Sequence, residues 1–476
     1  MATKQEKNIR KPSKLEAFSC LIVMILCLSF GTLNGVNVSA ALAIAVAYVI
    51  VVGMRCGYKL SDLLDAMNKK VADLVGLFFI LLGIGYLIAT FVYAGTIPTL
   101  IYYLLHIVSP SMCVLFAFLL TAITAALIGT SFGTCGTIGV AMMGLGVALG
   151  VNLPLLAGAV VSGSHVGLFL SPMADNFNLV ASVSKKDSIT VIKRAMYIAG
   201  PTFIVCIVFY TIMGFVSGTS GEAVNSIELC NGLAEIFKIS PIALIPLILV
   251  CAASALKVPA VISLFGSGFV AILIGWLLNG FDFWQGLIAS YSGFSLSTTL
   301  GLATDGIMPE IITLCNRGGM TSMASVFVIL FVAMAFAGVL IKIQALEVII
   351  DTLFGNVHSA FGLAVYSWII SALTVAMTSS SYIGQLMPIE MLSSKYEELG
   401  FSYLDCAVVS NTVSGDIMCI IPWTSTGIYM AGVVGVSCFT YAPYCIWGWG
   451  LGLMGIILSI FKFGYQKSSK PAVETA

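Results

Sequence analysis

Two nearby segments place glycines and polar side chains inside strongly apolar surroundings: GTSFGTCGTIG (Gly129–Gly139) and VVSGSHVGLFLSPMADNFN (Val160–Asn178). Glycine weakens a helix, and a polar group in an apolar environment is costly unless it is paired or used. These segments therefore indicate interrupted helices that serve a function inside a membrane.

Composition places the whole chain in a membrane. Of its 476 residues, 59% are hydrophobic and 9% are charged, and the mean hydropathy is +1.07. An average soluble protein has about 25% charged residues. Lys+Arg and Asp+Glu balance at 21 each, and the thirteen cysteines lack CxxC or metal-ligand spacing, so we expect them to be packing residues. We predict an all-α polytopic membrane protein.

Apolar runs of about 20 residues predict the spanning helices. Basic residues before Phe18, and again between Arg55 and Lys70, place the N-terminus and this link in the cytoplasm by the positive-inside rule. A short run, Thr99–Val108, is expected along the outer interface. The other expected helices are Phe18–Thr32, Val38–Gly53, Val71–Gly95, Met196–Val216, Pro241–Ala255, Pro259–Leu278 and Cys445–Ile460.

Two segments between these helices predict interruptions. Met112–Ile128 and Gly136–Val151 meet at Gly129–Thr134; each arm could span the membrane, but we favour a re-entrant hairpin. Leu153–Val183 as one helix would measure about 46 Å, which exceeds a hydrocarbon core of about 30 Å. We predict a break near Ser162–His165 or near Ser171–Asn178, which contains Pro172.

The second half repeats the first at a nearly constant offset, which relates Gly150 to Gly400 and Pro172 to Pro422. One loop is basic in the first copy, and the corresponding loop in the second copy is uncharged. This difference indicates that the two copies have opposite orientations in the membrane. Such inverted repeats with interrupted helices are typical of secondary transporters. We predict about ten spanning helices, two of them broken, plus two re-entrant hairpins in an elevator-type arrangement. The expected parts are a cytoplasmic tail (1–17), membrane repeat 1 (18–217), an extracytoplasmic linker (218–239), membrane repeat 2 (240–467, with an insert at 280–315) and a cytoplasmic tail (468–476).

Five motifs, in this order, resemble those of NhaC-type sodium/proton antiporters. They are TIPTLIYYLLHIVSPS (Thr96–Ser111), GTSFGTCGTIGVAMMGLG (Gly129–Gly146), SPMADNFNL (Ser171–Leu179), LCNRGG (Leu314–Gly319) and IPWTSTGIYMAGVVGV (Ile421–Val436). The resemblance covers nearly the whole chain. It implies the broader ion-transporter group, with two re-entrant hairpins, two broken helices and Ser-Asn-Thr signatures, of which Ser410-Asn411-Thr412 is one.

Two positions depart from the family pattern. Gly167-Leu168-Phe169 stands where the family has Gly-Asp and a basic residue, and Asn411-Thr412 stands where an acidic pair is usual. Similar proteins carry small organic anions and amino acids, including by malate/lactate exchange. The family favours sodium/proton exchange and the missing carboxylates favour an organic solute, so both alternatives stay open.

Hydroxyl, amide and carboxylate side chains at the interruptions are the candidate ligands. Unwound backbone and neutral oxygens can hold Na⁺, and the N-termini of broken helices can hold a carboxylate. The alternative roles are helix packing for the small residues and helix capping for Asp175. His165, Asp175 and Asp416 are also candidates for proton coupling, because each can titrate. The candidate ion- and substrate-binding residues are Thr130, Ser131, Thr134, Ser162, Ser164, His165, Asp175, Asn176, Asn178, Thr378, Ser379, Ser380, Ser410, Asn411, Thr412, Asp416 and Thr424.

The leading hypothesis is a secondary active antiporter coupled to Na⁺, H⁺ or both. No filter motif favours a channel, no HExxH motif favours an enzyme, and no Walker motif favours a primary pump. We expect no cofactor apart from transported Na⁺. The expected partners are the lipid bilayer and a small ion or organic solute, without nucleic acid, and a homodimer stays open. We expect a multi-pass protein of the cytoplasmic membrane with both termini in the cytoplasm.

Overall fold

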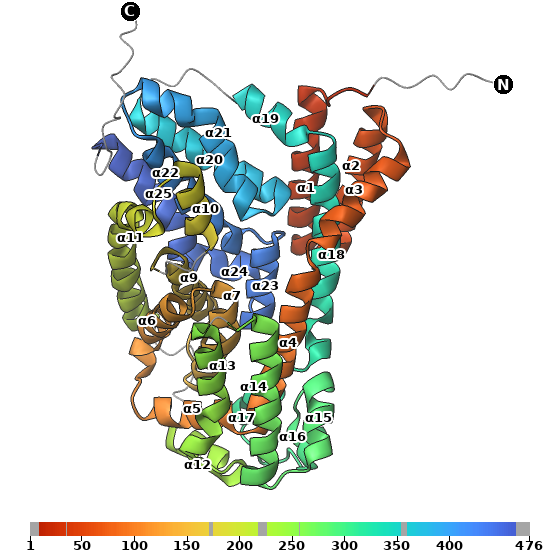
Figure 1. The fold of residues 1–476 in the computed structure, drawn as a ribbon. Helices are drawn as coiled ribbons and strands as arrows, with labels where there is room; N and C mark the ends of the chain where they lie inside the picture. Colours follow the sequence, from red (N-terminus) through yellow and green to blue (C-terminus); the bar gives the residue numbers. More distant parts are fainter. Residues whose placement is uncertain are drawn as a thin grey trace, which may run out of the picture.

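The structure is a computed structural model that describes residues 9–34, 36–170, 175–217, 226–256, 258–353 and 359–462. Within these ranges the regular elements are helices (Figure 1). Nine of the described helices are long and apolar enough to cross a membrane, or up to 12 if three bent pairs each count as one span. The prediction of an all-α polytopic membrane protein is confirmed.

The first helices follow the predicted order, with one addition. The link expected between Arg55 and Lys70 folds into a helix, α3, because its leucines recur on one face and its lysines occupy the last turn, where cations stabilise a helix end. The next short helix, α5, is largely buried by other parts of the protein. The elements are α1 (Lys14–Leu33), α2 (Val38–Arg55), α3 (Leu60–Ala72), α4 (Val75–Tyr93) and α5 (Thr96–Leu105).

The first hairpin is present, with a sharper tip than predicted. Its outgoing arm ends at Gly129, whose φ of 79° only glycine adopts readily, and the return arm starts directly after Thr130. A π-helical turn, a geometry often found at functional sites, interrupts the return arm. Both arms are long enough to span, so the re-entrant path stays a prediction. The elements are α6 (Pro110–Ile128), α7 (Ser131–Thr134), η1 (Cys135–Gly139) and α8 (Val140–Ala148).

The following segment contains two helices, α9 (Leu153–Leu170) and α10 (Asp175–Ser184). The sequence predicts a break near either Ser162–His165 or Ser171–Asn178. The first alternative is wrong, because α9 runs through Ser162–His165 and ends at Leu170, just before the second. Residues 171–174, which include Pro172, lie outside the described residues.

The helix α11 (Ser188–Val216) begins well before the predicted Met196. It starts there because the Asp187 side chain accepts the Thr190 backbone N–H at 2.9 Å, which caps the first turn.

The middle of the chain forms one end of the molecule (Figure 1). The predicted linker contains a helix, α12, and the predicted insert contains three short helices, α15 to α17. The elements are α12 (Ser226–Ile236), η2 (Pro241–Leu244), α13 (Ile245–Ala255), α14 (Ala260–Ile274), η3 (Gly275–Asn279), α15 (Phe283–Ser292), α16 (Leu296–Leu300), α17 (Pro309–Cys315) and η4 (Met320–Met323).

The second half contains another hairpin and a bent helix pair. The axis turns by 47° between Tyr403–Ile420 and Ser425–Val434, where Pro422 lies, as expected for one broken helix. The elements are α18 (Ala324–Lys342), α19 (Ala345–Leu353), α20 (Ala360–Thr378), α21 (Ser381–Glu398), α22 (Tyr403–Ile417), η5 (Met418–Ile420), α23 (Ser425–Val434), α24 (Cys438–Tyr441), η6 (Ala442–Tyr444) and α25 (Ile446–Ile460).

Helix boundaries in the two halves keep the offset that relates Gly150 to Gly400 in the sequence. Helices α6 and α20 have 19 residues each, and the same offset relates their first residues. Helices α10 and α23 have 10 residues each and are related in the same way. The two hairpin tips correspond as well, since Gly129 and Ser379 both have left-handed backbone, with φ of 79° and 51°.

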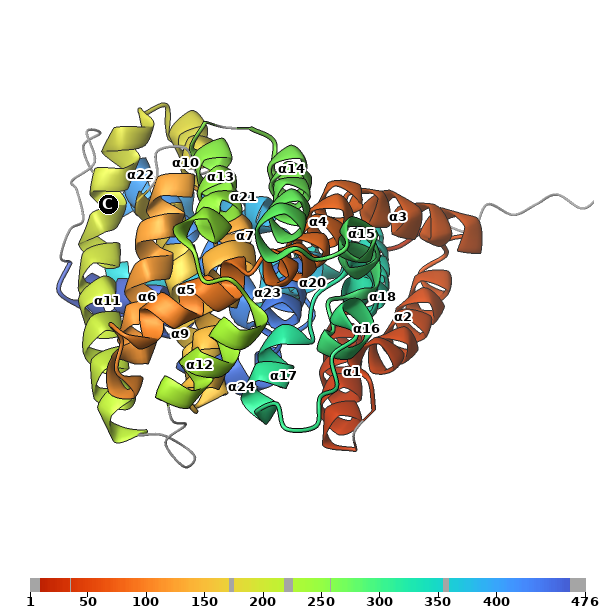
Figure 2. The same ribbon diagram turned by 90° about the horizontal axis from the view of Figure 1, so that it is seen from below.

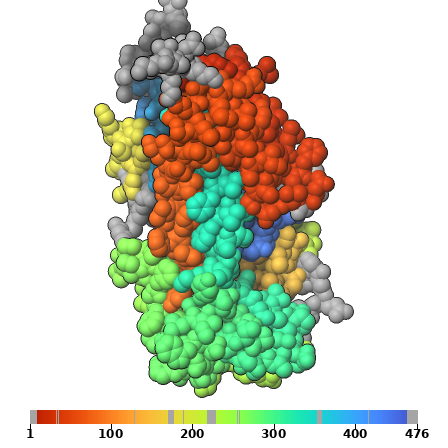
Figure 3. Space-filling model, turned by 90° about the vertical axis from the view of Figure 1, so that its right-hand side faces the viewer, coloured from red at the N-terminus to blue at the C-terminus, as the bar shows by residue number. Residues whose placement is uncertain are grey.

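The helices form two groups. Helices α1 to α4, α14 and α18 pack together on one side, and α6, α9, α11, α20 to α22 and α25 pack together on the other (Figure 1). Figure 2 shows the same division from below, with α7 and α23 between the groups. Figure 3 shows the outer face of the first group, where α18 runs between N-terminal helices and the helices of the middle segment lie below.

Two contacts hold the second group together. Helix α9 packs so closely on α6 that a methyl group on Gly167 would overlap the carbonyl of Ala125. Helix α11 is tied to α22 by a buried ion pair in which Arg194 Nε donates to Asp405 Oδ1 at 2.8 Å. Asp405 also accepts the backbone N–H of Ser402, which caps α22.

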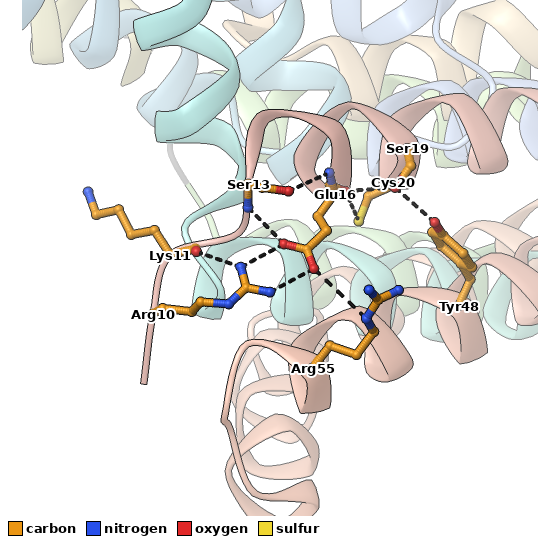
Figure 4. Close-up of polar contacts among 8 residues, drawn as sticks. All are labelled: Arg10, Lys11, Ser13, Glu16, Ser19, Cys20, Tyr48 and Arg55. Carbon is orange, nitrogen blue, oxygen red and sulfur yellow. Dashed lines mark hydrogen bonds and ion pairs between the residues drawn. The ribbon is translucent and has the colours of Figure 1, made fainter. Parts of the chain in front are cut away.

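An ion-pair cluster anchors the start of α1 (Figure 4). Glu16 accepts hydrogen bonds from Arg10 at 2.7 and 2.8 Å and from the Ser13 backbone N–H at 2.8 Å. Lys11 binds Glu347 of α19 at 2.7 Å, and this carboxylate raises the pKa of Lys11. The N-terminal segment is thereby joined to the second half of the chain.

Candidate functional site

The main candidate site is a cavity of about 580 Å³ between the two helical groups, which we call the tip cavity. Its walls come from the end of α3, the first part of α4, α18, both hairpin tips and the start of α23. The lining residues are Lys70, Asp73, Leu74, Leu77, Ile80, Gly129, Thr130, Ser131, Phe132, His165, Met334, Ser379, Ser380, Ser381, Tyr382, Met418, Ser425 and Thr426.

The first tip contributes Thr130 and Ser131, two of the candidate binding residues. Thr130 is the N-terminal flanking residue of α7, so backbone N–H groups that have no helical partner lie beside it. Thr134, also predicted, does not line the cavity, because it is buried and its hydroxyl donates to Thr130 O at 2.9 Å.

The second tip contributes Ser379 and Ser380, also candidate binding residues. Ser379 Oγ accepts the backbone N–H of Ser425, and Ser380 Oγ accepts the backbone N–H of Ile383 at 3.4 Å. Thr378 is turned back into its helix, where its hydroxyl donates to Thr374 O at 2.7 Å. The first tip therefore offers two adjacent hydroxyl residues to the cavity and the second offers three, Ser379 to Ser381.

His165 reaches the same cavity from α9. Its Nδ1 lies 2.8 Å from Val161 O, so Nδ1 carries a proton, since a carbonyl can only accept. Its Nε2 is buried and has no hydrogen-bond partner among the described residues. The free Nε2 can accept a hydrogen bond or a proton from a bound solute.

The two predicted serines beside His165 are structural. Ser162 Oγ accepts the hydroxyl of Tyr210 at 2.6 Å and the backbone N–H of Trp447 at 3.3 Å, which joins three helices. Ser164 donates to Val161 O at 2.8 Å. Because these polar groups are satisfied by helices, they do not interrupt α9.

Of the predicted acidic and amide residues after Pro172, only Asn178 has a described side chain, and it is not among the residues that line the cavity. The side chains of Asp175 and Asn176 lie outside the described residues, and Asn178 is exposed on α10. Asp416 is fully buried and accepts the indole N–H of Trp447 at 3.0 Å, away from the cavity lining. The roles proposed for Asp175 and Asp416 in proton coupling stay predictions.

The predicted signature Ser410-Asn411-Thr412 lies within the continuous helix α22, not at an unwound segment. Ser410 donates to Cys406 O at 2.8 Å and Thr412 to Val409 O at 2.7 Å. Asn411 is buried, and both of its amide atoms lack partners within the part of the chain that the structure describes. Thr424, the last predicted residue, caps α23, because its Oγ1 accepts the Gly427 N–H at 3.1 Å.

Sequence reasoning missed several lining residues. Lys70 and Asp73 form an ion pair of 3.2 Å at the mouth, where the Asp73 side chain is 65% exposed. In the sequence analysis, Lys70 served only to assign the membrane topology. Its position next to a spanning helix was a signal that it could also face an internal cavity. Met334 carries no local signal in the sequence, whereas Ser425 and Thr426 lie in the motif Ile421–Val436 without being chosen as candidates.

The cavity chemistry is that of a neutral, hydrogen-bonding site. Hydroxyl oxygens and backbone groups line it, and Asp73 is its one carboxylate within the described chain. No group of three or more His, Cys, Asp or Glu side chains suitable for a metal occurs among these residues. Oxygen donors of this kind suit a hard monovalent cation or a polar organic solute.

The fold is that of a polytopic membrane protein with an internal cavity lined by hydroxyl groups. The comparisons agree: residues 165–463 match the model of the Na⁺/H⁺ antiporter family. An uncharacterized Na⁺/H⁺ antiporter of Haemophilus influenzae is 33% identical over 98% of this chain and 100% of its own length. A malate-2H⁺/Na⁺-lactate antiporter of Bacillus subtilis is 31% identical over 96% of both chains, and the Na⁺/H⁺ antiporter NhaC of Alkalihalophilus pseudofirmus is 27% identical over 88% of both.

The chain belongs to the Na⁺/H⁺ antiporter family of the NhaC type, whose members are secondary active antiporters.

Proposed function

We propose that this antiporter binds its solute in the tip cavity and couples the movement to Na⁺, H⁺ or both. One observation carries the proposal: hydroxyls from both hairpin tips and the free Nε2 of His165 converge on one cavity between the two helical groups. Transporters with internal repeats commonly place their binding site at such a repeat interface.

We also propose an elevator-type movement of inverted repeats. Pairs of helices with equal length at matching places in the two halves, such as α4 and α18, support the repeats. The position of α5 and α19 at opposite ends of the molecule supports their inversion (Figure 1). In this proposal α1 to α4 and α18 form the scaffold. Both hairpins and α9, α11, α22 and α25 move as one unit that carries the tips.

The cavity mouth supports an orientation. Lys69 and Lys70 end α3, and the positive-inside rule assigns this end of the molecule to the cytoplasm. The tails 1–17 and 468–476 would lie on the same side, in the cytoplasmic membrane of the cell. The described state is then open inward.

A second candidate function is exchange of a small organic anion. Its support is the cavity itself, because about 580 Å³ far exceeds what one Na⁺ needs. The similarity to a malate-2H⁺/Na⁺-lactate antiporter points the same way.

Transport by purified protein in proteoliposomes separates the two. Dissipation of an imposed pH gradient by Na⁺ alone is expected for inorganic exchange. Counterflow of a radiolabelled hydroxy acid or amino acid, absent without its unlabelled partner inside, is expected for organic exchange. A variant in which Thr130 and Ser380 are both alanine should lose either activity, and wild-type turnover in this variant would reject the tip cavity as the binding site.

A further inference from the structure

Four polar side chains between α20, α21 and α22 are buried without hydrogen-bond partners. Thr374, Gln385, Asn411 and Ser414 are each at most 1% exposed. Both hydroxyls and all four amide atoms lack a partner within the described chain. Buried polar groups are almost always satisfied, so these six atoms indicate a ligand at this place.

The four side chains share one interface. A methyl group on Gly384 would lie 3.0 Å from Ser414 Cβ, and the Cys406 thiol lies 3.7 Å from Pro388 O, so α21 and α22 run side by side in opposite directions. Between these two contacts, Gln385 falls opposite Asn411. Ser414 follows Asn411 by three residues on the same face of α22.

Helix α20 completes this interface. Ser371 donates to Gly384 O at 2.8 Å, and Thr374 lies one turn further along α20, toward the hairpin tip. The hydroxyl of Thr374 therefore lies on the side of α20 that faces α21.

The corresponding positions in the first half show that packing does not require these groups. By the repeat offset, Gln385 and Asn411 correspond to Cys135 and Val161, which are both buried. Thr374 and Ser414 correspond to Thr124 and Ser164, whose hydroxyls are bonded to Leu120 O and Val161 O in their own helices. The second half has two amides in place of apolar groups and leaves two hydroxyls unpaired within the described residues.

We propose that these four side chains bind one Na⁺ ion, with Gln385 Oε1, Asn411 Oδ1 and the hydroxyl oxygens of Thr374 and Ser414 as ligands. The proposal rests on the proposed coupling to Na⁺ and locates the coupling ion inside the second hairpin, apart from the solute in the tip cavity. Oxygen ligands suit a hard cation. Four neutral ligands favour a monovalent ion. The buried Asp416 accepts the Trp447 indole N–H through Oδ1, and its Oδ2 has no partner among the described residues.

Thermal unfolding and transport in Na⁺ test this proposal, with choline at equal ionic strength as the reference. Na⁺ should raise the unfolding temperature of the wild-type protein. Gln385→Leu and Asn411→Val should each raise the Na⁺ concentration for half of this effect at least tenfold. Cys406→Ala, a buried truncation on the same helix, should leave it unchanged.

A gain-of-charge variant covers the case in which the apolar variants fail to fold. Asn411→Asp is nearly isosteric, and its carboxylate should lower the half-effect Na⁺ concentration and make it depend on pH. Folded variants that keep the wild-type Na⁺ dependence would overturn the proposal, because the cluster would then hold only water. Wild-type protein without any Na⁺ response in unfolding or transport would instead reject Na⁺ coupling itself.

Discussion

Ser379 joins the second hairpin tip to the start of α23: its Oγ accepts the Ser425 backbone N–H at 2.7 Å, and its hydroxyl lies 3.4 Å from Ser425 Oγ. Ser379 holds a left-handed backbone with φ of 51° to do so. The tip and the restarting half of the broken helix are therefore fixed to each other, and both line the tip cavity.

Two substitutions at Ser379 should separate the hydrogen bond from the backbone strain. Ser379→Ala loses the bond and keeps the strain, so we expect a stability loss of about 1 kcal/mol and reduced transport. Ser379→Gly also loses the bond but relieves a strain of about 1 kcal/mol, as Gly129 does in the first tip. Thermal unfolding should therefore rank glycine above alanine while transport is reduced in both. Equal unfolding temperatures would contradict the assigned strain.

The close contact between α6 and α9 predicts an effect of a single methyl group. Gly167→Ala would collide with the Ala125 carbonyl and should destabilise the protein by about 1–3 kcal/mol. Gly200→Ala in α11 is the matched control, because nothing lies within 4 Å of its added methyl group. It should be neutral or stabilise by up to about 1 kcal/mol. Thermal unfolding in detergent measures both changes.

Removing one partner of the buried ion pair Arg194–Asp405 should destabilise the protein more than replacing both partners with uncharged residues. Arg194→Met leaves a buried carboxylate without its counter-charge, so we expect a loss of about 3 kcal/mol. Asp405→Asn keeps an oxygen that can cap α22. The variant with both Arg194→Met and Asp405→Asn should lose less stability than the two single losses added together. If the losses in unfolding experiments simply add, the two residues are not coupled.

The hairpin tips were predictable because hydroxyls and glycines in an apolar run have few structural uses. Thr130 and Ser379 both line the cavity, as expected from sequence. The break at Ser162–His165 was wrong because Ser164 and His165 bond to Val161 O and satisfy themselves within α9. A polar residue in an apolar run therefore marks an interruption only when its helix cannot supply a partner.

Residues that meet only through tertiary structure could not be found from the sequence. Gln385 and Asn411 lie on different helices, α21 and α22, and no local pattern connects them. Lys70 reaches the tip cavity only because α3 forms, whereas the sequence predicted no more than a link there. The repeat offset was the one long-range signal in the sequence. It related the two hairpins correctly, because their helix boundaries differ by the same offset.

The N-cap of α11 should contribute to stability in a pH-dependent way. Hydrogen bonds from the Thr190 hydroxyl and backbone N–H lower the pKa of Asp187 below its usual value. The contribution is therefore present above the pKa of the unfolded chain and is lost as pH falls through the lower pKa of the folded protein. In Asp187→Asn, the unfolding temperature should therefore fall less as the pH is lowered, because this carboxylate no longer titrates. Asp187→Ala, which lacks any cap, should be less stable at every pH.

His165 and His106 form a matched pair that tests proton coupling. Both place Nδ1 on the carbonyl four residues earlier, at 2.8 Å from Val161 O and 2.7 Å from Tyr102 O. Only His165 lines the tip cavity, where its buried Nε2 has no partner among the described residues and can accept a proton from a bound solute. We expect His165→Asn, which can keep the carbonyl bond but not Nε2, to abolish H⁺ movement in proteoliposomes loaded with a pH-sensitive dye. His106→Asn should leave it unchanged. Full H⁺ movement in the His165 variant would assign proton coupling to another residue, of which Asp416 is the first to test.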